Sequence, residues 1–324
     1  MIDPVHEPQN SKPTQGVLVL VGPTASGKTS LSILLATLLD GEIISADSRQ
    51  IYRYMDIGTA KSSVEQRTQV KHYFVDEFDP DQDFNAGEYG KRGRAIIDSM
   101  LKRGKRPIVV GGSGLYIQAV IDGLFEGPSA EIDIRRKLNQ RLHDEGAGKL
   151  LEELRTFDPE SASRMLPSHT RRIIRAIEVY YETGIPISQL QQHKISIEFM
   201  PCFVGLNCER VKLYQRIDVR VEKMLSDGFL DEVRRLQERG FDKSLNAFQT
   251  VCYKEAFDYL DGKITYDRMV ELMKQNTRRY AKRQLTWFRR DERITWFESA
   301  EEHQLLTVVS SIAEYFSKFV SMYI

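Results

Sequence analysis

The sequence predicts an α/β protein with a P-loop NTPase-like parallel sheet core and an inserted all-helical domain. A phosphate-loop motif lies between an apolar, strand-like run and an amphipathic, helix-like one. Strand-like and helix-like segments then alternate, a pattern that is typical of a parallel sheet covered by helices. The strand signals stop between Phe125 and about Gln192 and return at Cys202, which indicates a helical insertion within the core.

The first strand and helix flank the phosphate-loop motif. Val17–Val21 reads as a buried strand, and apolar residues recur at helical spacing at Leu31, Leu34, Leu35 and Leu38. Residues 22–29 fit the pattern G-x-x-x-x-G-K-[ST], in which backbone N–H groups cradle linked phosphates. In such a loop Lys28 reaches the outer oxygens and the Thr29 hydroxyl can ligate Mg²⁺. We therefore predict a diphosphate site formed by Gly22, Pro23, Thr24, Ala25, Ser26, Gly27, Lys28 and Thr29.

Further strands complete the predicted core. The apolar runs are Glu42–Ala46, His72–Phe78, Pro107–Gly112, Cys202–Asn207 and Ile294–Phe297. Helical patterns fill the insertion, and the chain after the fourth of these runs is mainly helical and increasingly basic. We predict a flexible lead-in over residues 1–15, a first core part over 16–125, a helical insertion over 126–192 and a second core part with basic helices over 193–324.

Composition limits the partners and the compartment. The 324 residues hold 46 Lys and Arg against 46 Asp and Glu, so a polyanion must be bound by a local basic patch. The three cysteines form no C-x-x-C pair and no metal-like group with the six histidines, which argues for a reducing compartment and against structural zinc. Residues 1–15 resemble neither a signal peptide nor a membrane anchor. We expect a cytoplasmic protein with no membrane contact, and we interpret His72, His143 and His193 as structural or surface groups.

Asp47 follows the second predicted strand, at the edge where open α/β sheets gather their ligand-binding groups. Its carboxylate can serve as a Mg²⁺ ligand or as the general base for an attacking hydroxyl or amine, and Asp is also common in structural caps. The next strand end carries the glycine-rich turn Gly111–Tyr116, which permits close backbone approach but is weak as a sign of function. Spacing alone leaves the role of Asp47 open.

Cations alternate with aromatic residues over residues 277–290. On a helix this arrangement gives a basic face for a phosphate backbone, with the aromatic side chains packed inward or stacked on bases, but it also fits an ordinary solvated face. The basic helix start at 169–175 has the same two interpretations. Arg216 and Arg220 are spaced i and i+4, so both can point at one anion while Asp218 points elsewhere.

Five segments follow one another in the order of a known family: Gly22–Thr29, Asp47–Tyr52, Met55–Lys61, Gly111–Tyr116 and Ala281–Gln284. Together they resemble the tRNA dimethylallyltransferase family over residues 16–297. The resemblance implies transfer of a dimethylallyl group from dimethylallyl diphosphate to N6 of the adenosine at position 37, just 3′ of the anticodon. The tRNAs it implies are those that read codons beginning with U.

The resemblance also implies roles for single residues. Asp47 becomes the general base, because an exocyclic adenine amine is a poor nucleophile. Lys28 and a Mg²⁺ ion on Thr29 would stabilise the leaving diphosphate, with Thr24 near its bridging oxygen and Arg220 on its phosphates. Residues 48–50 would hold the target base. The positions that match the family's tRNA contacts are Asp47, Ser48, Arg49, Gln50, Ser113, Arg135, Arg171, Arg172, Ile173, Ile174, Arg175, Gln249, Thr250, Val251, Cys252, Tyr253, Lys254, Thr277, Arg278, Arg279, Tyr280, Ala281, Lys282, Arg283 and Gln284.

A base stacked in the anticodon loop cannot reach a buried phosphate loop, so the nucleotide must be turned out of the stack. The resemblance implies that the helical insertion clamps the anticodon stem-loop, and we expect a monomer. Two positions depart from the family: Cys252 stands where glycine is usual, so the backbone geometry there can differ, and Ser113 replaces the commoner threonine but keeps the hydroxyl. Without the C-terminal zinc-finger extension of many eukaryotic relatives, the chain resembles the bacterial form.

Two other functions remain open at the level of sequence. A P-loop small-molecule kinase would use Asp47 to activate a hydroxyl towards the γ-phosphate of ATP, and it would not need the basic helix. A nucleotide-switched RNA-binding protein would need no transfer chemistry and would tolerate Asp47→Asn.

Overall fold

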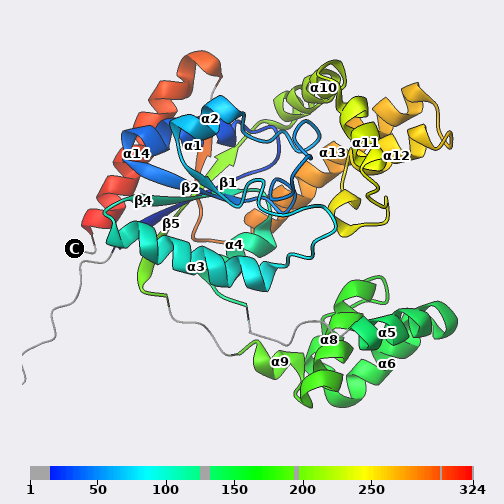
Figure 1. Cartoon of the computed structure of the whole chain (residues 1–324). Helices are drawn as coiled ribbons and strands as arrows, with labels where there is room; N and C mark the ends of the chain where they lie inside the picture. The colour runs from blue at the N-terminus through cyan, green and yellow to red at the C-terminus, as the bar shows by residue number, and fades with distance from the viewer. Residues whose placement is uncertain (1–14, 125–131, 193–196, 300, 323–324) are drawn as a thin grey trace, which may run out of the picture. The chain divides into compact units, whose positions relative to one another are not determined.

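The computed structural model describes residues 15–124, 132–192, 197–299 and 301–322. Its centre is a six-stranded sheet in the order β3-β2-β4-β1-β5-β6, with every neighbouring pair parallel (Figure 1). The strands are β1 (Gln15–Val21), β2 (Gly41–Ala46), β3 (His72–Tyr73), β4 (Arg106–Gly111), β5 (Phe199–Asn207) and β6 (Thr295–Glu298). The predicted α/β class and parallel sheet are confirmed.

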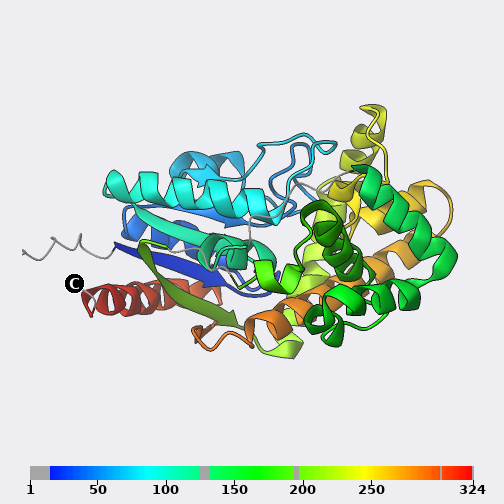
Figure 2. The same cartoon turned by 90° about the horizontal axis from the view of Figure 1, so that it is seen from below.

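The apolar run that forms β1 is buried on both faces of the sheet. Leu18 and Leu20 pack into one apolar cluster, while Val17, Val19 and Val21 pack into another. Because side chains alternate along a strand, the two clusters lie on opposite faces. The first face is covered by α1 (Lys28–Leu38) and α14 (Leu305–Ser321), the second by α3 (Ala86–Lys102) and α4 (Gly114–Ile121). Figure 2 shows α14 in red and α3 in cyan on opposite sides of the sheet.

Helices from the second half of the chain gather beside one end of the sheet (Figure 1). They are α10 (Arg210–Ser226), α11 (Phe229–Glu238), α12 (Tyr253–Leu260) and α13 (Tyr266–Phe288), with a short 3₁₀ turn at Asn246–Phe248. Their apolar faces join the same cluster as α3 and α4, through large buried side chains such as Phe229 and Phe248. Thr265 starts the longest of them, because its hydroxyl accepts from the Arg268 N–H (3.3 Å). The short helices α2 (Val64–Gln69) and Glu302–Gln304 complete the core unit.

The chain divides into two compact units, Met1–Ile121 with Ile197–Ile324, and Asp122–Ser196. The second unit holds α5 (Ile132–Glu145), α6 (Ala147–Phe157), α7 (Pro159–Ser163), α8 (Thr170–Thr183) and α9 (Ile187–Leu190). Its own apolar core lies between α5, α6 and α8. Asp158 joins its two short helices by accepting from the N–H groups of Ser161 (2.9 Å) and Ser188 (3.0 Å). The predicted boundary at residue 126 lies outside the described residues, and the one at residue 192 directly precedes residues 193–196, which the structure does not describe.

The predicted strand His72–Phe78 is wrong in its length. The strand β3 ends at Tyr73, because Phe74 and Asp76 adopt φ angles of 60° and 57°, which strands do not accommodate. Phe74 is fully buried, so its apolar character reflects burial rather than extended backbone. The predicted lead-in lies outside the described residues except for Gln15, which begins β1. Across the described ranges, no helix has the length and apolar character needed to cross a membrane.

Candidate active site

A cavity of about 550 Å³ opens at the carboxyl edge of the sheet, and all of its walls belong to the core unit. The phosphate loop, Asp47 and the glycine turn after β4 line it from the ends of β1, β2 and β4. One face of α10, the segment 250–252 and one face of α13 form further parts of the wall. Ligands of open α/β sheets bind at this edge. The cavity therefore brings together predicted site residues that are far apart in the sequence.

The phosphate loop forms one side of the cavity. Ala25 and Gly27 have φ angles of 63° and 87°, which let the chain turn sharply from β1 into α1. Residues 24–29 all line the cavity. The Ser26 hydroxyl is buried and has no hydrogen-bond partner in the part of the chain that the structure describes. A buried polar group without a partner fits the oxygen of a bound anion.

Lys28 is held within the loop itself. Its Nζ donates to the carbonyl groups of Gly22 (3.0 Å) and Pro23 (2.6 Å). Burial and then the nearby charge of Arg220 lower the pKa of Lys28 to about 7, with Asp47 partly opposing the shift. Near neutral pH this amine therefore carries only part of its charge, and a polyanion beside it would restore the rest.

The two oxygens of Asp47 have different surroundings. Oδ1 accepts from the backbone N–H groups of Arg49 (2.9 Å) and Gln50 (3.3 Å), as in a structural cap. Oδ2 receives no hydrogen bond from the described residues, and Asp47 lines the cavity. The structural and chemical roles considered for Asp47 are thus compatible, because one oxygen fixes the turn and the other can accept a proton.

The residues after Asp47 are fixed by other parts of the core. The Ser48 N–H donates to the Ser113 hydroxyl (3.1 Å). The hydroxyl that Ser113 shares with the commoner threonine therefore has a structural role. Gln50 Nε2 donates to the carbonyl of Thr59 (3.2 Å). The predicted base-holding segment 48–50 therefore has a defined conformation beside the cavity.

Arg216 and Arg220 both line the cavity from one face of α10, as their spacing predicts. Arg220 Nη2 lies 3.5 Å from the Thr59 carbonyl oxygen. Asp218 does not line the cavity and instead accepts from Arg278 (2.8 Å). The carboxylate between the two arginines in sequence is thus directed to a different cation.

One face of α13 enters the cavity through Thr277, Tyr280 and Gln284. Gln284 Oε1 accepts from the Thr24 N–H (2.9 Å), and Nε2 donates to the Gly112 carbonyl (3.0 Å). This side chain is 6% exposed, and both ends of its amide are bound within the protein. The Gln284 amide therefore ties the phosphate loop to the glycine turn, and its predicted contact with tRNA stays a prediction.

Several other side chains at predicted tRNA-contacting positions are buried. Tyr253, Thr277 and Ala281 in the core unit, and Ile173 and Ile174 in the helical unit, are at most 7% exposed. These side chains lie on the inner faces of their helices and contribute to packing, and Thr277 also lines the cavity. The exposed cations of the same segments are Arg171, Arg172, Lys254, Arg279, Lys282 and Arg283.

Arg135 and Arg175 of the helical unit are held by one buried carboxylate. They donate to Oε2 of Glu178 at 2.8 Å and 2.7 Å. Glu178 is fully buried, while the side chains of the two arginines are 48% and 30% exposed. Charge-assisted bonds of this kind fix the guanidinium groups without removing them from the surface.

Cys252 occupies an unusual backbone conformation in the cavity wall. Its φ of 73° and ψ of −51° lie where a residue with a Cβ is disfavoured and glycine is not. Its Sγ lies 3.8 Å from the Thr277 hydroxyl, and burial raises the pKa of the thiol to about 12. The three cysteines are free and buried. No group of three or more His, Cys, Asp or Glu suited to a metal occurs among the described residues.

The sequence patterns missed several residues of the cavity and its support. Thr59, Ala60 and Lys61 line it, and so does His72, which the sequence marks only as structural or surface. Glu232 on α11 supports this part of the wall from behind, through bonds described below. The signal for Glu232 is its place in an otherwise apolar stripe, with Phe229, Val233 and Leu236.

The donor groups around the phosphate loop fit a magnesium ion. Mg²⁺ is usually held by one or two protein oxygens together with phosphate oxygens and water. Thr29 and Asp47 both line the cavity, and the buried Ser26 hydroxyl has no partner among the described residues. This small oxygen set is what Mg²⁺ on a diphosphate requires.

Comparison with known proteins identifies the family. A profile described as IPP transferase matches residues 50–291. A tRNA dimethylallyltransferase from Pelobacter propionicus is 46% identical over 288 residues, which cover 88% of this chain and 93% of the relative. The chain belongs to this family. A tRNA dimethylallyltransferase from Geobacillus thermodenitrificans is 44% identical over 304 residues, 93% of this chain and 96% of the relative.

Solved structures of IPP transferase relatives have the same fold. A tRNA isopentenylpyrophosphate transferase from Bacillus halodurans superposes with a TM-score of 0.68 at 38% identity, covering 94% of this chain and 99% of that one. A eukaryotic dimethylallyltransferase described as acting on tRNA gives a TM-score of 0.81 at 30% identity, covering 96% and 81%. This enzyme is therefore a tRNA-modifying prenyltransferase. The family assignment decides against the small-molecule kinase and the nucleotide-switched RNA-binding protein.

Proposed function

We propose that this enzyme transfers the dimethylallyl group of dimethylallyl diphosphate to N6 of adenosine 37, in tRNAs that read codons beginning with U. The observation that carries the proposal is the placement of Asp47. Its Oδ2 receives no hydrogen bond from the described residues, and it shares one cavity with Lys28 and Arg220. A proton acceptor beside a cationic phosphate site is what alkyl transfer from a diphosphate ester to an amine requires.

The phosphate loop would hold the leaving group. The loop N–H groups and Lys28 would donate to the phosphate oxygens, and Arg220 would add a second cation. The bond between C1 of the dimethylallyl group and the bridging oxygen breaks, and its electron pair leaves with the diphosphate. Thr24 has its N–H bound to Gln284, so its hydroxyl is the group that would donate to the bridging oxygen. These donors stabilise charge where it develops.

Asp47 would receive the proton of the acceptor. The lone pair of N6 is delocalised into the adenine ring, so N6 attacks C1 more readily when the proton passes to Oδ2 of Asp47. Tyr280 lies in the same cavity, and burial, with the nearby Asp47 charge, raises its pKa to about 12. Its hydroxyl therefore stays protonated and can donate to the base or to the carboxylate. The adenosine reaches this cavity only when turned out of the anticodon stack.

Magnesium and the cellular setting complete the proposal. Thr29 and the phosphate oxygens would hold Mg²⁺, which supplies further positive charge at the leaving group. We propose that the enzyme acts as a monomer. The free, buried cysteines support a reducing compartment, for which the cytoplasm is the simplest choice.

The test is transfer of radiolabelled dimethylallyl from its diphosphate to a suitable tRNA with Mg²⁺, using the wild type and Asp47→Asn side by side. We expect label in the RNA with the wild type. With the variant we expect a transfer rate at least about 100-fold lower, while the affinity for tRNA is retained. No label from the wild type across several such tRNAs would contradict the proposed reaction. Equal rates in the two proteins would contradict the role of Asp47.

A further inference from the structure

The loop Met55–Lys61 forms part of the cavity wall without being a helix or a strand. Its second half, from Gly58 to Lys61, lines the cavity. Irregular backbone keeps one position only where its polar groups find partners. Two buried charges, one from a distant helix and one from the loop itself, provide them.

Glu232 on α11 holds the first half of the loop. Its Oε2 accepts from the N–H groups of Asp56 (2.8 Å) and Ile57 (2.7 Å), and its Oε1 accepts from Gly58 (3.1 Å). The Tyr253 hydroxyl donates to the same Oε1 (2.6 Å). Glu232 is 4% exposed, so four charge-assisted bonds converge on it away from water, where such bonds are strong.

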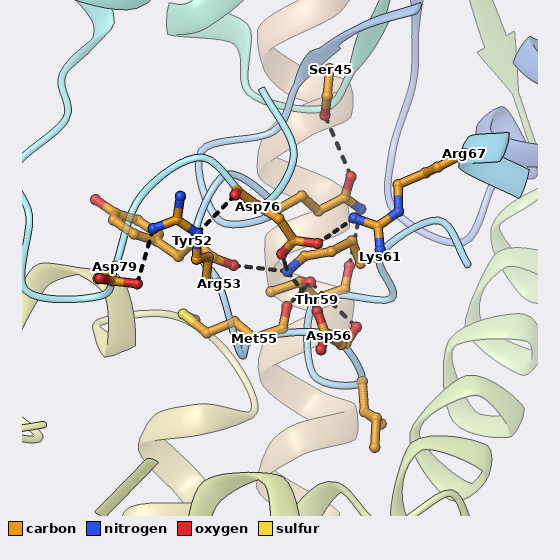
Figure 3. A network of polar contacts seen from close by, with 12 residues as sticks. Ser45, Tyr52, Arg53, Met55, Asp56, Thr59, Lys61, Arg67, Asp76 and Asp79 are labelled. Carbon is orange, nitrogen blue, oxygen red and sulfur yellow. Dashed lines mark hydrogen bonds and ion pairs between the residues drawn. The ribbon is translucent and has the colours of Figure 1, made fainter. Parts of the chain in front are cut away.

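Lys61 holds the end of the loop. Figure 3 shows its amine at the centre of a network, where Nζ donates to the Tyr52 carbonyl (2.8 Å) and the Asp56 carboxylate (2.7 Å) and pairs with Asp76. Arg67 pairs with the same Asp76 carboxylate. Lys61 is part of the cavity wall, but its side chain is only 2% exposed. Its charge is therefore directed to the loop rather than to a ligand.

The loop is also pressed closely against the helices behind it. A Cβ added to Gly58 would lie 2.4 Å from the Phe229 ring and 2.5 Å from the Tyr253 ring. No side chain fits there, so the backbone approaches α11 and α12 as closely as glycine allows. Glu232 thus forms its bonds where the loop packs tightly against α11 and α12, and this packing restricts movement of the loop backbone.

The supported loop presents carbonyl groups to two residues of the site. Gln50 Nε2 donates to the carbonyl oxygens of Thr59 (3.2 Å) and Ala60 (3.3 Å). Arg220 Nη2 lies 3.5 Å from the same Thr59 oxygen. A shift of the loop would therefore move the acceptors of both side chains together.

We propose that Glu232 is a positioning residue for the transfer reaction. Through the Met55–Lys61 loop it fixes Arg220 for the diphosphate and Gln50 for the base, although it does not itself line the cavity. The inference rests on the roles proposed above for these two residues. Replacing Glu232 leaves loop N–H groups without acceptors, and the loop relaxes towards other positions.

The test compares Glu232→Gln with Glu42→Gln. Glu42 is a matched control, since it is 8% exposed and accepts from the Tyr73 hydroxyl (2.8 Å) and from Arg103 (2.8 Å), yet lies outside the cavity wall. At a temperature where both are folded, we expect Glu232→Gln to lower kcat/KM for dimethylallyl diphosphate about tenfold or more, through both a higher KM and a lower kcat. The affinity of Glu232→Gln for tRNA should stay within about twofold of the wild type, and so should the kinetics of Glu42→Gln.

Wild-type kinetics in folded Glu232→Gln, or an equal loss in Glu42→Gln, would overturn the proposal. If Glu232→Gln does not fold, Glu232→Asp takes its place, since it keeps the charge but withdraws both oxygens by one methylene, and the same loss is expected. Calorimetric binding of inorganic diphosphate gives a separate measurement. Weaker binding in the Glu232 variant alone would support the positioning role even if the wild type transferred no label, a result that would contradict only the proposed function.

Discussion

Lys28 illustrates how the surroundings of a single residue set its chemistry. Its amine is buried between two loop carbonyl groups and near a second cation, and its pKa falls to about 7. The unfolded chain keeps this proton up to about pH 10.5, so the group makes folding less favourable as the pH falls from there towards 7. A bound polyanion reverses the effect, because it favours the charged amine.

We therefore expect proton uptake when inorganic diphosphate binds. Above about pH 7 the amine is mostly neutral beforehand and charged afterwards, so up to one proton enters and affinity falls as the pH rises. Calorimetry in two buffers with different ionisation enthalpies counts the protons, after correction for the titration of diphosphate itself. Lys28→Met should take up none beyond that correction, and equal uptake by both proteins would contradict the assignment.

Cys252 gives a second prediction at this scale, since its positive φ favours glycine. Cys252→Gly and Cys252→Ala both remove the sulfur, but only the glycine variant relieves the backbone. We expect Cys252→Gly to be the more stable of the two by about 1 kcal/mol, the reverse of their order at an ordinary helical position. Urea unfolding of the two variants measures the difference, and an alanine variant as stable as the glycine variant would show that the backbone there is unstrained.

At the scale of elements, α13 links parts of the site that are distant in sequence. Gln284 joins the loop after β1 to the turn after β4, so one helix fixes two strand ends. The outer face of the same helix carries Arg279, Lys282 and Arg283, which are exposed. These exposed cations fit both interpretations of the segment, an RNA-binding face and an ordinary solvated face.

Gln284→Ala should weaken donor binding. The change removes the partner of the half-buried Thr24 N–H and of the buried Gly112 carbonyl, at a cost of about 1–3 kcal/mol. Part of this cost lowers the affinity of the loop for the diphosphate. We expect KM for dimethylallyl diphosphate to rise about tenfold. Thr286→Ala is the control, because Thr286 is exposed on the same helix and bonds only to its own turn, at Lys282; similar KM values in the two variants would argue against the link.

The sequence predicts the elements well where a local period controls them. The parallel sheet was predicted from the buried runs and the phosphate loop, but β3 is shorter than its apolar run because burial of Phe74 does not require extended backbone. Asp47 and Arg220 were predictable because strand ends and helix faces have regular geometry. The role of Glu232 was not, since its bond to Gly58 joins residues 174 positions apart and depends on how α11 packs.

At the scale of the whole molecule, equal numbers of cations and anions mean that tRNA affinity depends on where the charges stand. Many of the described cations are paired, as Arg278 is with Asp218 and Lys61 is with Asp56. The exposed cations on the outer face of α13 are among those suited to phosphate contact.

We expect the double change Lys282→Gln with Arg283→Gln to weaken tRNA binding and to make it less sensitive to salt. Removing one cation that binds a phosphate should reduce the slope of log affinity against log salt by roughly one. Arg268→Gln removes an exposed cation at the other end of α13, where it pairs with Glu271 (2.6 Å), and should leave the slope unchanged. Filter binding at several salt concentrations measures all three proteins, and equal slopes would exclude α13 from the RNA interface.

The pairing of β1 with β5 has a consequence for synthesis of the chain on the ribosome. Val19 lies opposite Phe203, so the strand that leads into the phosphate loop lacks one neighbour until the whole helical unit has been translated. At ~5–20 residues per second, the interval is roughly 10–40 s. During that time the unpaired edge of an apolar strand can pair with other nascent chains. The helical unit is also synthesised completely before the second part of the core. Slower translation of residues 122–196 should therefore favour aggregation over yield.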